Sequence, residues 1–203
     1  VNTSGTTGLT LGNGGTLGGA YVSHTGALTL SGVSLAADQP LWVVASGALT
    51  LPVQVISTGT AGLYLESGTS LSTAGALSTT TGTIDLVANS GGITINEAVS
   101  SSGGGTVSLS ASGGGISIGK TVSSSGGTVN LTSTGAITQT AAISGATLNA
   151  KTLNDLGSDI MLNSGTNDFN TVTLQARNAA DSADTPGAIS WNDVDGYDVA
   201  SVR

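Results

Sequence analysis

Three consecutive segments of near-identical layout decide the fold of this chain. Residues 82–104 read GTIDLVANSGGITINEAVSSSGG, residues 105–126 read GTVSLSASGGGISIGKTVSSSG, and residues 127–145 read GTVNLTSTGAITQTAAISG. The pattern recurs every 19 to 23 residues, and its length varies within the Gly- and Ser-rich stretches. A repeat of this length indicates a solenoid, in which each repeat contacts only its neighbours.

Within each repeat, aliphatic side chains alternate with polar ones in three short runs. The aliphatic positions of the first two repeats are Ile84, Leu86, Ile93, Ile95 and Val99, then Val107, Leu109, Ile116, Ile118 and Val122. Alternation with a period of two predicts short strands with one face inward, three in each repeat. We expect the glycine clusters between strands to form the corners, where left-handed backbone angles are required.

Weaker copies of the same alternation occur on both sides of the three repeats. They include Leu9/Leu11, Leu28/Leu30 and Leu49/Leu51 before them, and Ile160/Leu162 and Val172/Leu174 after them. Parallel crossovers favour right-handed winding. The sequence therefore predicts an all-β fold, a right-handed parallel β-helix (β-solenoid) of about nine triangular coils, each of roughly 19–23 residues.

The pattern divides the chain into two parts. Residues 1–177 are predicted to form the solenoid shaft, and residues 178–203 an acidic terminal coil of the same solenoid or the start of a next module. Pro40, Pro52 and Pro186 are expected at corners or edges, because proline interrupts the ladder of backbone hydrogen bonds. The chain opens in mid-pattern without a start methionine or signal peptide, and we expect it to be a piece of a longer mature protein.

The composition argues against several classes of function. Of 203 residues, 12 are acidic and 4 are basic, and the net charge of −8 does not suit binding to nucleic acid or to an anionic membrane. No apolar run approaches the roughly 20 residues that span a bilayer, so we expect no membrane insertion of this segment. Cysteine is absent, which removes disulfides, thiolate metal sites and cysteine nucleophiles.

No arrangement of residues predicts catalysis, and we expect the chain not to be an enzyme. His24 is the single histidine, has no partner for a triad or a metal cage, and is expected to be a solvated turn residue. Asp85 and Glu97 share one repeat, and Glu97 aligns with Lys120 of the next, which predicts a surface ion pair between coils. Gln139 takes an inward position that is isoleucine in the two preceding repeats, so either its coil is shifted or its amide joins an internal ladder.

One acidic stretch near the C-terminus is a candidate metal site. Asp193, Asp195 and Asp198 alternate with other residues around Gly196. Carboxylates spaced in this way beside a glycine can wrap Ca²⁺, which takes six to eight oxygen ligands from a flexible loop. Calcium bound by these three residues is the one cofactor hypothesis, and a solvated acidic turn is the alternative.

Four aromatic side chains are candidates for stacking on sugar rings, namely Trp42, Tyr64, Trp191 and Tyr197. The two tryptophans, Trp42 and Trp191, are the principal candidates for carbohydrate binding. A sugar platform needs two or more aromatic side chains on one face. The alternative is that these rings pack beneath a loop or against the end of a coil.

The sequence pattern GTVxLxSxGGIxI, which recurs as GTVSLSASGGGISI and GTVNLTSTGAITQ, resembles the repeats of a known family. It is similar to the filamentous haemagglutinin-like and other repeat-rich adhesins of Gram-negative bacteria, which are exported by two-partner or autotransporter routes. The resemblance implies a shaft segment of a secreted, extracellular surface fibre with a role in adhesion, aggregation or biofilm. The expected partners are other segments or copies of the same fibre, and host or bacterial surface glycans or proteins.

Two other functions fit a parallel β-helix. The first is a carbohydrate-binding or glycan-cleaving protein, which is suggested by analogy of fold alone. The second is an ice-binding surface, for which Thr94, Ser117 and Thr138 are aligned outward candidates in successive repeats.

Overall fold

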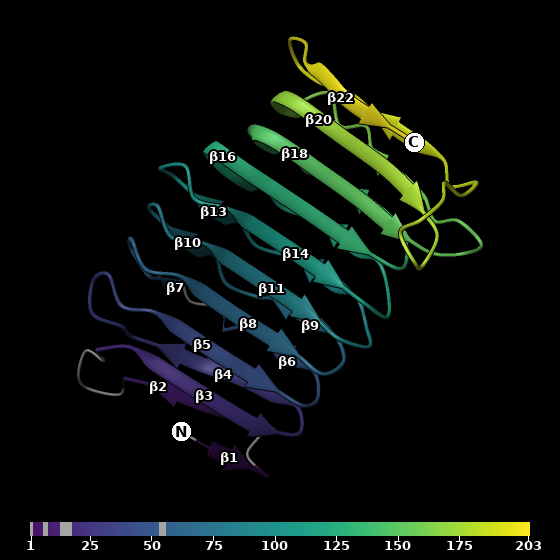
Figure 1. Cartoon of the computed structure of the whole chain (residues 1–203). Coiled ribbons are helices and arrows are strands. Elements are labelled where there is room, and N and C mark those ends of the chain that lie inside the picture. The colour runs from purple at the N-terminus through teal and green to yellow at the C-terminus, as the bar shows by residue number, and fades with distance from the viewer. Residues whose placement is uncertain (1, 6–7, 13–17, 53–55) are drawn as a thin grey trace.

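The computed structural model describes residues 2–5, 8–12, 18–52 and 56–203. Within these residues the chain is all β, with 22 strands and no helix. The strands pair in parallel and stack as coils of a β-solenoid of about eight turns, where the sequence predicted about nine. Successive coils rise from the purple N-terminal end to the yellow C-terminal end and wind in a right-handed sense, as predicted (Figure 1).

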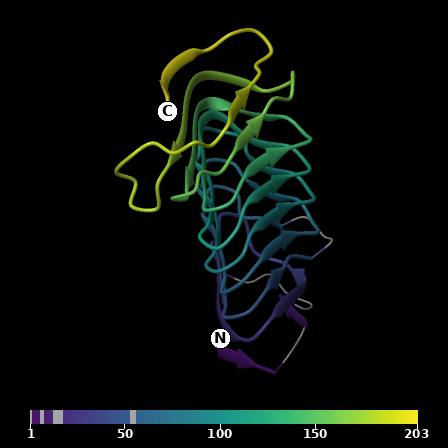
Figure 2. The same ribbon diagram turned by 90° about the vertical axis from the view of Figure 1, so that its right-hand side faces the viewer.

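Two long faces of the solenoid run the length of the stack. The strands of the first face, in spatial order, are β1 (Asn2–Ser4), β3 (Ala20–Thr25), β5 (Leu41–Ala45), β8 (Leu63–Ser67), β11 (Ile84–Ala88), β14 (Val107–Ala111), β16 (Val122–Ser133), β18 (Ile143–Leu153), β20 (Asp168–Arg177) and β22 (Asp198–Val202). The strands of the second face are β2 (Gly8–Leu11), β4 (Leu28–Val33), β6 (Leu49–Thr50), β9 (Leu71–Thr73), β12 (Ile93–Ile95), β15 (Ile116–Ile118), β17 (Ile137–Gln139), β19 (Ile160–Leu162) and β21 (Ile189–Trp191). Figure 2 shows the stack from the side.

A third, shorter face completes the triangular coils from β7 onward. Its strands are β7 (Ile56–Ser57), β10 (Leu77–Thr79), β13 (Val99–Ser101) and the first residues of β16, β18 and β20. In β16 this strand continues without a break into the first-face strand of the next coil, so the corner between the third and first faces is flattened. Gly126 adopts a left-handed φ of 72° at this point, and the pairing with β18 shifts register between Ser124 and Thr128.

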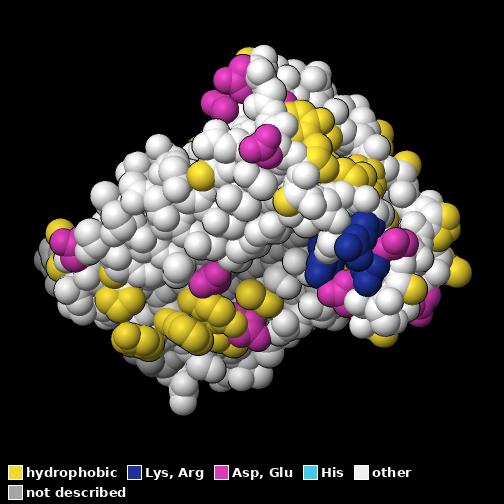
Figure 3. Space-filling view, turned by 45° about the horizontal axis from the view of Figure 1, so that its top comes forward, with side chains coloured by type: hydrophobic (Ala, Val, Ile, Leu, Met, Phe, Trp, Pro, Cys, Tyr) yellow, Lys and Arg dark blue, Asp and Glu magenta, His cyan; other side chains and the backbone are white. Residues whose placement is uncertain are grey.

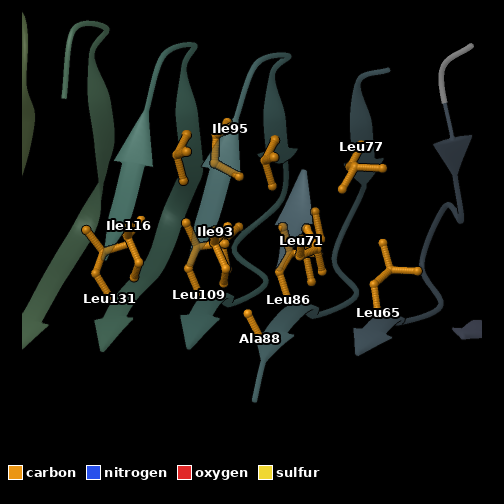
Figure 4. Close-up of a cluster of buried hydrophobic side chains, with 14 of the residues drawn as sticks. Leu65, Leu71, Leu77, Leu86, Ala88, Ile93, Ile95, Leu109, Ile116 and Leu131 are labelled. Carbon is orange, nitrogen blue, oxygen red and sulfur yellow. The ribbon is translucent and has the colours of Figure 1, made fainter. Parts of the chain in front are cut away.

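The inward positions predicted from the alternation are confirmed. Ile84 pairs with Val107 and Val107 with Val129, and all three side chains are 0% exposed. Figure 4 shows the same stacking for the leucines of adjacent coils, such as Leu86 and Leu109. Each coil therefore shields the aliphatic side chains of its neighbours from water, which is the largest favourable term in folding.

Glycines at the corner after β14 are required for close approach of the coils, and the expectation of left-handed angles there was wrong. Gly113 and Gly115 are not among the described glycines with a left-handed φ, although such glycines do occur at other corners. A Cβ on Gly113 would lie 2.3 Å from the carbonyl carbon of Ser90, and one on Gly115 would lie 2.4 Å from the carbonyl oxygen of Ala136. Backbone packs directly on backbone here, so only glycine fits.

The C-terminal part of the chain continues the stack after one excursion. β21 pairs with β19, and β22 pairs with β20. The excursion is the loop between β20 and β21. It is held against the shaft through Asp181, which accepts hydrogen bonds from Lys151 Nζ at 2.6 Å and from Arg177 Nε at 3.1 Å. These two cationic donors hold the pKa of Asp181 below its ordinary value. Arg177 also pairs with Asp184.

All three prolines lie outside strands, as expected from the missing backbone donor. Pro40 directly precedes β5, Pro52 follows β6, and Pro186 lies in the loop before β21. The carbonyl of Pro40 still accepts a hydrogen bond from the amide of Ala20, at 3.0 Å, because proline keeps its acceptor.

Replacing Leu109 by alanine should lower the free energy of unfolding by about 2–5 kcal/mol, because the side chain is buried between two coils. Guanidinium denaturation followed by far-ultraviolet circular dichroism measures the change. The matched control is Ser110→Ala on the outward side of the same strand, for which a change within about 0.5 kcal/mol is expected. Equal destabilisation by both variants would contradict the assignment of inward and outward positions.

Replacing Gly113 by alanine should force the two adjacent coils apart and lower the free energy of unfolding by about 1–3 kcal/mol. The control is Gly165→Ala, whose Cβ would meet its nearest neighbour, the Nδ2 atom of Asn192, at an ordinary 3.5 Å. Thermal unfolding of both variants provides the comparison. A Gly113→Ala protein as stable as the Gly165→Ala protein would show that the corner can relax.

Candidate functional site

An aromatic ridge, which we define as Tyr21, Trp42 and Tyr64, stands on the N-terminal half of the first face. The three residues are the second positions of β3, β5 and β8 and pair directly across the ladder. Their strand neighbours point inward and are buried, so the three rings point outward. Tyr21 is 62% exposed and Trp42 is 46% exposed, which makes this ridge the main outward aromatic feature of the described first face.

Two rings of the ridge, those of Trp42 and Tyr64, stand on edge. The ring centroids of Trp42 and Tyr64 are 4.0 Å apart, and their planes differ by 20°. Rings that lay flat on the sheet could not approach this closely, so the two rings overlap face to face and present their edges to solvent. One face of the Trp42 ring is therefore covered by Tyr64, which removes it from stacking on a sugar.

A carboxylate anchors the Tyr64 ring. The Tyr64 hydroxyl donates a hydrogen bond to Glu66 Oε2 at 2.7 Å, and the Asn89 amide donates to Glu66 Oε1 at 2.7 Å. Burial, the hydrogen bond to Glu66 and the negative charges of Glu66 and Asp85 raise the pKa of Tyr64 to about 12. Tyr64 is thus a neutral donor held in place over the pH range of ordinary solutions.

A small notch lies beside the ridge, at the corner where the first face begins. It has a volume of about 140 Å³ and is lined by apolar and ring atoms of Trp42, Pro40 and Tyr64, with Asp85 at one end. Gly62 leaves part of the wall without a side chain. Figure 3 shows a group of hydrophobic side chains with acidic ones among them at the lower left, while the dark-blue Lys and Arg side chains lie at the right beside other acidic side chains.

Beyond Tyr64 the same outward row turns polar. Asp85 pairs with Tyr64 in the ladder, and Ser108, Asn130 and Asn149 follow in successive coils. Asn149 Nδ2 donates to Asn130 Oδ1 at 2.9 Å, and Asn130 Nδ2 lies 3.4 Å from Ser108 Oγ. The row therefore changes from aromatic to acidic to amide along the axis of the solenoid.

The second predicted tryptophan lies at the opposite end of the molecule. Trp191 is half-buried, and its ring centroid lies 5.9 Å from that of Phe169 and 5.8 Å from that of Tyr197. It packs against the end of the core rather than on an open face. Trp42 and Trp191 are thus not brought together as one sugar platform.

The three aspartates predicted to bind calcium are used in part by the backbone. Asp193 accepts hydrogen bonds from the amides of Phe169 at 3.2 Å, Gly196 at 3.3 Å and Asp195 at 3.4 Å, and so stabilises its own turn. Asp195 and Asp198 are exposed. Among the described residues, no group of three or more His, Asp or Glu side chains is gathered as ligands for a metal ion.

His24 is buried, so the expectation of a solvated turn residue was wrong. It occupies an inward position of β3 and is 3% exposed. Its Nδ1 atom lies 2.8 Å from the Thr3 hydroxyl, and its Nε2 atom lies 3.2 Å from the carbonyl oxygen of Ala27. The Thr3 hydroxyl and the Ala27 carbonyl thus satisfy both ring nitrogens. The side chain points inward because it alternates in register with the buried Ala20 and Val22 of the same strand.

Gln139 joins an internal amide pair, and its coil is not shifted. It pairs with Ile118 in register, and its Nε2 atom donates to Asn167 Oδ1 at 2.7 Å. Asn167 is 0% exposed, and its Nδ2 atom donates to Gln139 Oε1 at 3.1 Å and to the carbonyl oxygen of Leu162 at 2.9 Å. The buried polar groups are satisfied, so this cluster is structural.

The predicted surface pair of Glu97 and Lys120 does not form within the described structure. Both side chains are exposed, and the salt bridges of the described residues instead join Lys151 and Arg177 to the loop after β20. The outward Thr94, Ser117 and Thr138 do form a row on the second face, through direct pairing of β12, β15 and β17. No helix of the described chain has the length and hydropathy to cross a membrane.

Sequence reasoning missed Tyr21, although a signal was present. Tyr21, Trp42 and Tyr64 are spaced by 21 and 22 residues, which is the length of the repeat. Applied to the aromatic residues, this spacing predicts one outward row. Trp191 and Tyr197 share no such spacing with each other.

Replacing Glu66 by glutamine should lower the pKa of Tyr64 from about 12, because the hydrogen bond to an anion and its charge are lost. The pKa should stay above the ordinary 10.0, because burial is the largest cause of the shift. Since the folded-state pKa is raised, the stabilising contribution is complete below pH 10.0 and is lost as the pH rises through about 12.

Spectrophotometric titration of the tyrosinate band measures this shift, with Tyr64→Phe identifying the transition of Tyr64. Glu97→Gln removes the same charge from a distant exposed site and should leave the titration unchanged. An unaltered Tyr64 transition in the Glu66→Gln protein would contradict the hydrogen bond.

Comparisons of the chain with known protein families, curated proteins and solved structures found no match in any of the three. The resemblance to filamentous haemagglutinin-like adhesins therefore stays a prediction.

Proposed function

We propose that this chain is a structural shaft segment of a secreted bacterial surface fibre, which supports adhesion, aggregation or a biofilm matrix outside the cell. The observation that carries the proposal is the continuity of the stack. The first-face ladder runs from β1 to β22 and the second-face ladder from β2 to β21, with a register that keeps the aliphatic columns aligned. A solenoid of this kind grows longer with each added coil, and each coil contacts only its two neighbours. This architecture suits a spacer.

The C-terminal end of the stack supports association with other segments or copies of the fibre. Val199 and Val202 pair with the buried Val172 and Leu174, so they continue the inward columns. They are nevertheless 56% and 53% exposed, because none of the described coils covers them. A following coil of the same fibre would bury both side chains and continue the ladder of backbone hydrogen bonds.

The alternative of a carbohydrate-binding or glycan-cleaving protein has weaker support. Trp42 has one ring face covered by Tyr64, and Trp191 is packed at the far end of the core. An open aromatic platform for sugar stacking would require two uncovered ring faces on one surface.

Deleting residues 107–128 removes one whole coil and joins Thr106 to Val129, which occupies the register position of Val107. The shortened protein should keep its β-sheet circular dichroism spectrum and lose about 4.8 Å of length along the axis, as measured by small-angle X-ray scattering. Deleting residues 107–117, half a coil, should instead disrupt the fold because it breaks the register. Unfolding of the whole-coil deletion would contradict a modular shaft.

The cellular side of the proposal needs a separate measurement. Antibodies raised against the chain should label filaments on the surface of intact cells of the producing bacterium in electron micrographs. Label confined to the interior of the cell, or turnover of a polysaccharide by the intact chain, would contradict the proposed role.

A further inference from the structure

The N-terminal half of the first face carries a feature that a spacer does not require. The aromatic ridge ends at Asp85, which occupies the next rung of the same outward row. Because the Trp42 and Tyr64 rings stack along this row, the second face of the Tyr64 ring is turned toward Asp85. A ring face and a carboxylate thus border the same notch.

The Asp85 carboxylate has no partner within the described structure. No described residue donates a hydrogen bond to it, and the described salt bridges use other carboxylates. Glu66, the neighbouring carboxylate, is already engaged by the Tyr64 hydroxyl and the Asn89 amide. The notch therefore combines apolar walls with one uncompensated negative charge, on a chain whose net charge is −8.

The size of the notch limits its occupant to one side chain. Its volume of about 140 Å³ is close to the roughly 150 Å³ of a cavity that holds benzene. An arginine side chain matches both parts of the site. Its methylene stem can pack on Trp42 and Pro40, and its planar guanidinium can stack on Tyr64 while it donates to Asp85.

We propose that this notch binds an arginine side chain of an extended polypeptide segment from a partner protein, with the edges of the ridge packing against apolar neighbours of that arginine. Charge complementarity decides the class of partner. Asp85 borders the notch and Glu66 accepts the hydrogen bond of Tyr64, so a second copy of this acidic chain would bring like charges together, and a neutral glycan would leave Asp85 without a counter-charge. The proposal goes beyond the shaft function and does not depend on it.

The test measures fluorescence anisotropy of a labelled, capped pentapeptide that has a central arginine flanked by leucines and glycine at each end. Its counterpart carries citrulline, the uncharged isostere, in place of arginine. The intact chain should bind the arginine peptide at least about tenfold more tightly than the citrulline peptide, as expected for one charge-assisted hydrogen bond. Added salt should weaken the binding of the arginine peptide.

The variant Asp85→Asn should lose at least about tenfold in affinity for the arginine peptide, and Trp42→Ala should also weaken binding. The matched control is Asp195→Asn, which removes the same charge from an exposed loop at the other end and should bind as the unaltered chain does. Far-ultraviolet circular dichroism establishes that each variant is folded.

Three results would overturn the proposal. Equal loss in Asp85→Asn and Asp195→Asn would assign binding to overall charge. Binding of maltohexaose that is lost in Trp42→Ala but kept in Asp85→Asn would assign the surface to a neutral glycan. A concentration-dependent dimer in sedimentation that is abolished by Asp85→Asn and by Lys120→Gln would assign the notch to a second copy, because Lys120 is an exposed cation outside the described salt bridges.

Discussion

The structure depends on the burial of each coil's aliphatic side chains by the coils on either side. A single coil contains three short strands around a thin layer of Ile, Leu and Val, and this layer has no cover of its own above or below. Ordering the backbone of one isolated coil would cost more free energy than its few aliphatic side chains return. Stacking removes the deficit, because every inner column, such as that of Ile84, Val107 and Val129, is sealed by its neighbours and by parallel hydrogen bonds.

The same constraint explains the corners. The ladder fixes the separation of adjacent coils along the strands, and the chain must turn within that spacing. At the corner after β14 the backbone of one coil lies on that of the next. A Cβ added to Gly113 would lie 2.3 Å from the carbonyl carbon of Ser90. In β16 the chain passes from the third face to the first without leaving the strand. Gly126 has a left-handed φ there, and the pairing shifts register between Ser124 and Thr128. Glycine therefore has two separate roles, which are to adopt a left-handed φ and to let the backbones of adjacent coils approach closely. Stacking of the coils imposes the second role.

The sequence predicted the periodic part of the structure and failed where a residue depends on one particular neighbour. Period-two alternation within a repeat of about 22 residues was sufficient for the strands, the inward side chains and the parallel stack. The single histidine was expected in solvent because it is polar, yet the alternation of β3 places His24 inward, where contacts with Thr3 and Ala27 satisfy its ring. The sequence pattern also did not predict the salt bridges of Lys151 and Arg177 with Asp181, because the repeat does not determine the path of an irregular loop.

The candidate site follows from the freedom that stacking leaves on the outer surface. Inward positions are mostly aliphatic, and the polar ones among them, such as His24 and Asn167, are satisfied by hydrogen bonds. Outward positions of the first face are held in straight rows whose members need only fit a pleated sheet. A change at one outward position therefore alters the surface without altering the fold. The row that begins with Tyr21, Trp42 and Tyr64 continues with Asp85 and then with amide and hydroxyl side chains, all at the spacing of the ladder. A rigid shaft can in this way carry a binding surface of defined chemistry, because the backbone that positions each side chain is fixed by the core beneath it.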